Sequence, residues 1–121
     1  MELYESREDY LETILILKEK LGAVRSIDIA REMKYSKPSV SVAMKKLKVN
    51  GYIVVNDDGT IDLTPLGLEL ASKTYEKHLL LVNAFIKLGV SEEIAREDAC
   101  KIEHHLSEET FDALKKFVEK I

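Results

Sequence analysis

The most constraining feature of the sequence is a β-hairpin pattern at residues 52–63. Two short runs rich in β-branched and aromatic residues, Tyr52–Val55 and Thr60–Leu63, flank the turn-forming segment Asn56–Gly59. Three segments with helical periodicity precede it, at about residues 6–21, 26–33 and 36–49. Three short helices followed by one hairpin is the element order of a winged helix-turn-helix, so we expect a mainly α fold with a small hairpin wing.

The third of these segments carries the clearest local signals for a helix. Ser36 is a favourable N-cap, and Pro38 falls in the first turn, where its missing amide hydrogen costs nothing. Asn50 and Gly51 tolerate the left-handed conformation of a helix end and predict that the helix stops there. Ser26 is expected to cap the second segment. The second and third segments therefore form the expected helix-turn-helix.

Three more helices are expected after the hairpin. Thr64 and Pro65 open a long helix to about Leu88, a second helix begins at Ser91 and ends near Leu106, and a last one follows Ser107. The apolar residues of the long helix spread over more than one face, which favours oligomerisation. The expected buried face of the last helix consists of Phe111, Leu114, Phe117, Val118 and Ile121. We expect two domains, a winged-helix head at 1–64 and a helical region at 65–121.

Charge is distributed unevenly along the chain. The formal net charge is -4, yet residues 31–56 hold six basic side chains and a single acidic one, Glu32. Local charge governs attraction to a phosphate backbone more than the total does, so this segment predicts binding of double-stranded DNA. The residues expected to contact bases or phosphates are Arg25, Ser36, Lys37, Pro38, Ser39, Ser41, Lys45 and Lys46.

A second group of residues has the composition of a metal site. Cys100, Glu103 and His104 stand at i, i+3 and i+4, so a helix would project thiolate, carboxylate and imidazole from one face. Asp9 and Glu12 form another i, i+3 pair. Each has a plainer explanation, because a lone cysteine is usually a small buried hydrophobe and surface carboxylates are usually solvated.

The chain resembles the family of the diphtheria toxin repressor and the manganese transport regulators over nearly its whole length. The carriers of the resemblance are Arg7-Glu8-Asp9-Tyr10-Leu11-Glu12-Thr13-Ile14, Ser36-Lys37-Pro38-Ser39-Val40-Ser41 and the segment from Asp98 to Ser107, DACKIEHHLS. The resemblance implies a homodimer joined by the C-terminal helices, which represses genes of metal homeostasis when loaded with metal, in the short form without a C-terminal barrel. It also implies six metal ligands: Asp9, Glu12, His78, Cys100, Glu103 and His104.

The sequence departs from both branches of that family. Manganese-type members place a carboxylate where Cys100 stands, whereas iron-type members have the cysteine but a methionine in place of Asp9. Val82 and Arg96 replace the residues of the iron-type accessory site, which we therefore do not expect. A mixed oxygen, nitrogen and sulfur ligand set suggests Fe²⁺ slightly over Mn²⁺, with Co²⁺ and Zn²⁺ as alternatives.

Two other functions compete with this hypothesis. One is a winged-helix transcription factor that metal does not regulate. The other is a metal-dependent hydrolase with Glu12 or Glu103 as general base, but the sequence shows no Gly-rich phosphate loop and no nucleophile motif, so we do not expect an enzyme. The acidic start, short apolar runs and single cysteine predict a cytoplasmic protein without a membrane partner.

Overall fold

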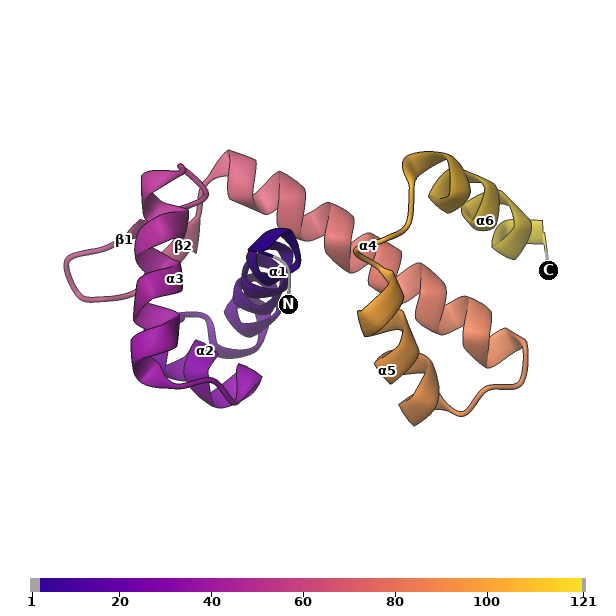
Figure 1. The fold of residues 1–121 in the computed structure, drawn as a ribbon, viewed down its shortest axis with the longest axis horizontal. Coiled ribbons are helices and arrows are strands. Elements are labelled where there is room, and N and C mark those ends of the chain that lie inside the picture. The colour runs from indigo at the N-terminus through magenta and orange to yellow at the C-terminus, as the bar shows by residue number, and fades with distance from the viewer. Residues whose placement is uncertain (1–2, 121) are drawn as a thin grey trace. The chain divides into compact units, whose positions relative to one another are not determined.

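A computed structural model describes residues 3–120, with side chains from Arg7 onward. Within this range the chain forms helices and one hairpin, as Figure 1 shows, which confirms the expected mainly α fold. The elements are α1 (Leu3–Leu21), α2 (Ser26–Met33), α3 (Lys37–Val49), β1 (Ile53–Val55), β2 (Ile61–Leu63), α4 (Pro65–Lys87), α5 (Glu92–Ile102) and α6 (Glu108–Lys120). No helix in the described range combines the length and apolarity that a bilayer crossing requires.

The chain divides into two compact units, Met1–Ser72 and Lys73–Ile121. The boundary falls inside α4, eight residues after the junction between Thr64 and Pro65 that the sequence suggested. Each unit has its own cluster of buried apolar side chains.

The first unit brings α1, α2, α3 and the hairpin together (Figure 1). Their buried apolar side chains form one core. Its largest fully buried apolar side chains come from every one of these elements or from the segments that join them, and they are Leu11, Ile14, Val24, Ile29, Val40, Ile53 and Ile61. Leu11 and Ile14 lie three residues apart on α1, which places them on one face of the helix. The unit therefore has a continuous core built from residues far apart in the sequence.

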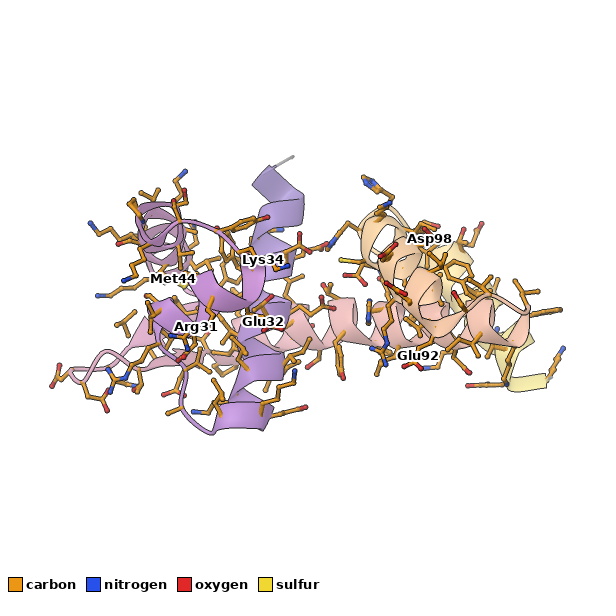
Figure 2. The ribbon with its side chains drawn as sticks, turned by 90° about the horizontal axis from the view of Figure 1, so that it is seen from below. Arg31, Glu32, Lys34, Met44, Glu92 and Asp98 are labelled. Carbon is orange, nitrogen blue, oxygen red and sulfur yellow. The ribbon has the colours of Figure 1, made fainter. Side chains whose placement is uncertain are left out.

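The link between α2 and α3 is tight because Lys34 adopts a left-handed conformation with φ of 59°. Figure 2 shows Arg31, Glu32 and Lys34 along this part of the chain. Ser36 caps α3 as expected, because its hydroxyl oxygen accepts from the Ser39 amide at 3.3 Å. Ser26 was expected to cap α2 but is its first residue; Arg25 is the N-cap, and its amide donates to the Asp28 carboxylate at 2.9 Å.

The hairpin is antiparallel and pairs Ile53 with Leu63, Val54 with Asp62 and Val55 with Ile61. The Ile61 amide also donates to the Val24 carbonyl at 2.7 Å, which attaches β2 to the segment before α2. Two side chains outside the hairpin also contact it. Lys18 Nζ lies 2.6 Å from Asp62 Oδ1, and Arg25 Nη1 donates to the carbonyl of Asp58 in the turn.

The second unit contains the later part of α4 together with α5 and α6. Its core is small and consists of Leu81, Val82, Ala95 and Ala99, with Phe85, Val90, Leu106 and Leu114 packed against it. Polar contacts attach α6 and the segment before it to α4. Lys115 Nζ lies 2.9 Å from Glu76 Oε1, and Lys77 Nζ donates to the Leu106 carbonyl at 3.3 Å.

Two expectations about this unit were wrong. Helix α5 ends at Ile102 rather than near Leu106, because the chain passes into a turn in which the His105 amide donates to the Ile102 carbonyl. Phe117 was expected in the buried face of α6 but is 60% exposed. Phe111 and Val118 are buried as expected, and Ile121 lies outside the described residues.

Candidate metal centre and nucleic-acid interface

Glu103 is the centre of a cluster of possible ligands in the second unit. It follows the last residue of α5 as the helix C-cap, and its carboxylate has no solvent exposure. His78 projects from α4, and its Nδ1 lies 2.8 Å from Glu103 Oε2. The ring of His78 stacks on Tyr75 one turn earlier, with 6.5 Å between the ring centroids, which fixes its orientation.

The second carboxylate oxygen of Glu103 faces a second imidazole. His104 Nε2 lies 3.6 Å from Glu103 Oε1, which is beyond hydrogen-bond distance, and the His104 side chain is only 3% exposed. Glu103 Oε1 accepts no hydrogen bond from any described residue although it is buried. A buried carboxylate oxygen without a donor is costly in a protein interior, so this position favours a cation.

Cys100 lies three residues before Glu103 on α5, and its sulfur and a Glu103 carboxylate oxygen lie within 4.8 Å of each other. The residue is exposed. The second unit thus contains four of the six expected ligand residues. Cys100 lies on α5, Glu103 is the C-cap of that helix, His104 lies in the following turn, and His78 lies on α4.

The remaining two expected ligands, Asp9 and Glu12, lie on α1 in the first unit. The Glu12 residue is 8% exposed, and Asp9 is half-buried. A third acidic residue of α1, Glu8, is also buried, at 7% exposure, and its burial was not predicted from the sequence. Its position one helical turn before Glu12 was the available signal, because residues four apart share a helix face.

The donor chemistry of these residues fits a divalent transition metal. Carboxylate oxygens, imidazole nitrogens and a thiolate are the ligands that iron, manganese, cobalt and zinc take in proteins. A purely structural cluster would supply each buried carboxylate oxygen with a hydrogen-bond donor, which Glu103 Oε1 lacks among the described residues.

The surface of α3 carries the residues expected to contact DNA. Its buried side is formed by Val40, Met44 and Leu47, which leaves the other sides of the helix to solvent. The exposed residues include Lys37, Pro38, Ser39, Ser41, Lys45 and Lys46 from the expected set. A helix with small hydroxyl side chains near its start and lysines near its end has the chemistry for base edges followed by phosphates.

Three residues of the expected DNA-contacting set, Arg25, Ser36 and Ser39, have partners inside the first unit. The Ser36 hydroxyl donates to the Ser39 hydroxyl oxygen at 2.8 Å in addition to capping α3, so its role is at least partly structural. Arg25 holds the wing turn through the Asp58 carbonyl. A Cβ on Gly59 would come within 2.9 Å of the Arg25 guanidinium, so glycine at this turn keeps that contact open.

The comparisons with known proteins divide the chain as its chemistry does. Residues 2–61 match the family "Iron dependent repressor, N-terminal DNA binding domain", and residues 64–121 match "Iron dependent repressor, metal binding and dimerisation domain". The transcriptional regulator MntR of Escherichia coli O6:H1 is 40% identical over 113 residues, which cover 93% of this chain and 73% of that protein.

Solved structures show the same similarity. The manganese regulator SloR superposes with a TM-score of 0.81 at 32% identity, and the alignment covers 93% of this chain. IdeR of T. acidophilum superposes with a TM-score of 0.79 at 28% identity over 91% of this chain. The chain spans about half of each of these two structures, 53% in both cases. On the evidence of both its halves, the chain belongs to the iron-dependent repressor family of metal-dependent transcriptional regulators.

Proposed function

We propose that this protein is a transcriptional repressor that binds operator DNA as a homodimer when it is loaded with a divalent metal ion. The observation that carries the proposal is the buried carboxylate of Glu103, which has an imidazole facing each of its oxygens and one oxygen without a donor. In a family of metal-dependent regulators, such a group is best explained as a metal ligand.

The ligands we propose are the six residues identified from the sequence: Asp9, Glu12, His78, Cys100, Glu103 and His104. A bound ion would neutralise the carboxylates and join α1 to the second unit through shared ligands. Mn²⁺ is favoured by the oxygen-rich set and by the similar solved structures that are named for manganese, whereas the thiol of Cys100 favours Fe²⁺. We retain a slight preference for Fe²⁺ because no carboxylate stands at position 100.

Two recognition helices, one from each subunit, would read successive major grooves of the operator. Ser39 and Ser41, which are exposed on α3, would contact base edges, and the exposed Lys45 and Lys46 would contact phosphates. Half-sites one helical turn apart would require a fixed spacing of the two α3 helices. The ion would raise operator affinity by favouring that spacing, so operator DNA must equally raise metal affinity.

The test is operator binding as a function of metal in the full chain. A duplex is first selected from a randomised pool in the presence of Mn²⁺, and its affinity is then measured by fluorescence anisotropy with chelator and with Mn²⁺, Fe²⁺, Co²⁺ or Zn²⁺ under anaerobic conditions. We expect metal to raise the affinity by about 5- to 150-fold, the usual range of an allosteric coupling. Anaerobic handling protects the thiol of Cys100 from oxidation.

The matched variants are His104→Ala and His105→Ala, which remove adjacent imidazoles. His104 is buried beside Glu103, whereas His105 is exposed. We expect the first variant to lose the metal response and the second to keep it. Equal DNA affinity with and without metal in the unmodified protein would favour the alternative function, a winged-helix regulator that does not respond to metal. Activity in the cytoplasm, on genes of metal homeostasis, is part of the proposal.

A further inference from the structure

Arg7 lies on a different side of α1 from the proposed metal ligands. At about 100° per residue, Arg7 is about 160° from Asp9 and about 140° from Glu12 around the helix axis, whereas these two carboxylates are only about 60° apart. Arg7 instead continues the stripe of Leu11 and Ile14, which are buried in the core of the first unit. One helix therefore carries the ligands on one side and a cation at the end of its core-facing stripe.

The Arg7 side chain reaches Tyr52, which lies 45 residues later in the sequence. Arg7 Nη1 donates to the Tyr52 hydroxyl oxygen at 3.2 Å, and the guanidinium carbon lies 5.3 Å from the centroid of the Tyr52 ring. Both contacts depend on direction, because the hydrogen bond requires alignment and the cation is attracted to the ring face. An apolar residue at this position would fill the same stripe without fixing the orientation of the helix.

Tyr52 is itself held by its backbone at the junction of α3, the wing and α4. Its amide donates to the Leu47 carbonyl of α3 at 3.0 Å, and its carbonyl accepts from the Thr64 amide at 3.0 Å. Gly67 of α4 packs directly on this carbonyl, since a Cβ there would lie 2.0 Å from the Tyr52 oxygen. A displacement of Tyr52 would therefore move the end of α3 and the beginning of α4 together.

We propose that Arg7 and Tyr52 are a pair of positioning residues that couple the metal-bearing helix α1 to the recognition helix. Neither residue belongs to the proposed metal ligands or to the proposed DNA contacts. When an ion fixes the ligand side of α1, the opposite side moves with it, and the Arg7–Tyr52 contact passes that orientation to α3 and the wing. This inference rests on the proposed function, because it assigns a route for the metal response.

The experiment compares the unmodified protein with Arg7→Met, Tyr52→Phe and the double variant, using Mn²⁺ and the selected duplex. The coupling factor is the ratio of duplex affinities with saturating Mn²⁺ and with chelator. We expect each single variant to lower this factor about 5-fold and the double variant to lower it no further, as a shared interaction requires. Duplex affinity in chelator and Mn²⁺ affinity without DNA, measured by calorimetry, should each change by less than about 2-fold.

Three features keep the test decisive. Tyr52→Phe removes a single hydroxyl and retains the ring, so it keeps the test available if Arg7→Met folds poorly. Arg7→Lys retains the charge without the guanidinium geometry and should keep part of the coupling. Lys20→Met removes an exposed cation from the same helix and should leave the coupling factor unchanged.

The failures are distinguishable. If the unmodified protein responds to Mn²⁺ and the variants respond equally, the role of the pair is overturned and the proposed function stands. Losses in the two single variants that add up in the double variant would also overturn the pair, because each residue would then act separately. An unmodified protein without any metal response overturns both proposals.

Discussion

The two units of this chain differ in the size of their buried apolar cores. The first unit buries seven large apolar side chains almost completely, and they come from its helices, its hairpin and the segments between them. The core of the second unit has two alanines among its four buried members. The same unit leaves Phe117 60% and Leu88 77% exposed. Burial of apolar surface is the main favourable term in folding, so this term stabilises the first unit far more than the second.

This difference in core size indicates how far the stability of each unit depends on binding partners. A head with a complete core keeps its shape while it binds DNA. A helical region with a small core would gain more stability from a second copy and from a bound ion. The match of residues 64–121 to a metal-binding and dimerisation domain agrees with this division. The comparison predicts that metal and protein concentration stabilise mainly the second unit.

The largest effect should come from the ion. At a free Mn²⁺ concentration about 1,000 times its dissociation constant, we expect stabilisation by about 4 kcal/mol, because the ion binds only the folded protein. Glu103→Gln should abolish this gain without a large loss of stability in the metal-free protein, because the amide keeps an oxygen and removes a buried charge that lacks a donor at one oxygen. Thermal unfolding followed by circular dichroism measures both quantities.

The matched control for that prediction is Glu97→Gln on the exposed side of α5, which should keep the full gain. Hydrogen exchange locates the effect, and metal should slow exchange of the α5 amides more than those of α2. Equal protection of α2 and α5 would contradict the proposed difference between the units.

The next largest effect concerns the core of the first unit. Ile14→Ala should lower the free energy of unfolding of this unit by about 3 kcal/mol, because it leaves a cavity at a residue that is 1% exposed. Urea denaturation followed by tyrosine fluorescence and circular dichroism measures the loss. The loss should not depend on protein concentration. Leu79→Ala, at a half-exposed position of the second unit, should destabilise in a concentration-dependent way instead.

A third prediction tests why Phe117 is exposed. If a second copy covers it, Phe117→Ala should weaken dimerisation by about 10- to 100-fold, the range of a truncated aromatic residue at an interface. Sedimentation equilibrium measures the dimer dissociation constant. The neighbouring Lys116→Ala serves as the control on the same helix and should change it little. An unchanged constant for Phe117→Ala would remove this residue from the dimer interface.

The smallest effect concerns the wing. Asp62 is held by Lys18 and Asn56, and their hydrogen bonds lower the pKa of its carboxyl. The stabilising contribution is therefore present above the unfolded pKa of about 3.9 and is lost as pH falls through the lower folded value. Asp62→Asn should cost less than about 1 kcal/mol at pH 7, because Lys18 and Asp62 are both exposed. Unfolding curves between neutral and acidic pH should show a flatter acid limb for the variant.

The elements predicted correctly from the sequence are those with local signals. The hairpin follows from its turn residues, and the start of α3 follows from Ser36 and Pro38, because these residues act on their own neighbours. The proposed ligand set rests on spacing along a helix and on the family resemblance, and it stays a prediction. The early end of α5 was missed because its turn depends on contacts of the following segment rather than on a glycine or proline.

Contacts between distant segments were beyond sequence reasoning. Arg7 and Tyr52 are 45 residues apart, and nothing local marks either as a partner of the other. The exposure of Phe117 was missed for a related reason. Helical periodicity identifies a candidate apolar face, but it does not say whether that face meets the same chain or another molecule.

The left-handed lysine between α2 and α3 has a consequence for engineering this scaffold. Lys34 adopts a conformation that costs an L-residue with a side chain roughly 1–2 kcal/mol, and glycine or asparagine would adopt it more readily. The backbone of this link is therefore slightly strained, and the two helices on either side hold it in that conformation. Substitution of Lys34 by glycine would relieve this strain and make the DNA-binding unit more stable, at a site whose side chain is exposed.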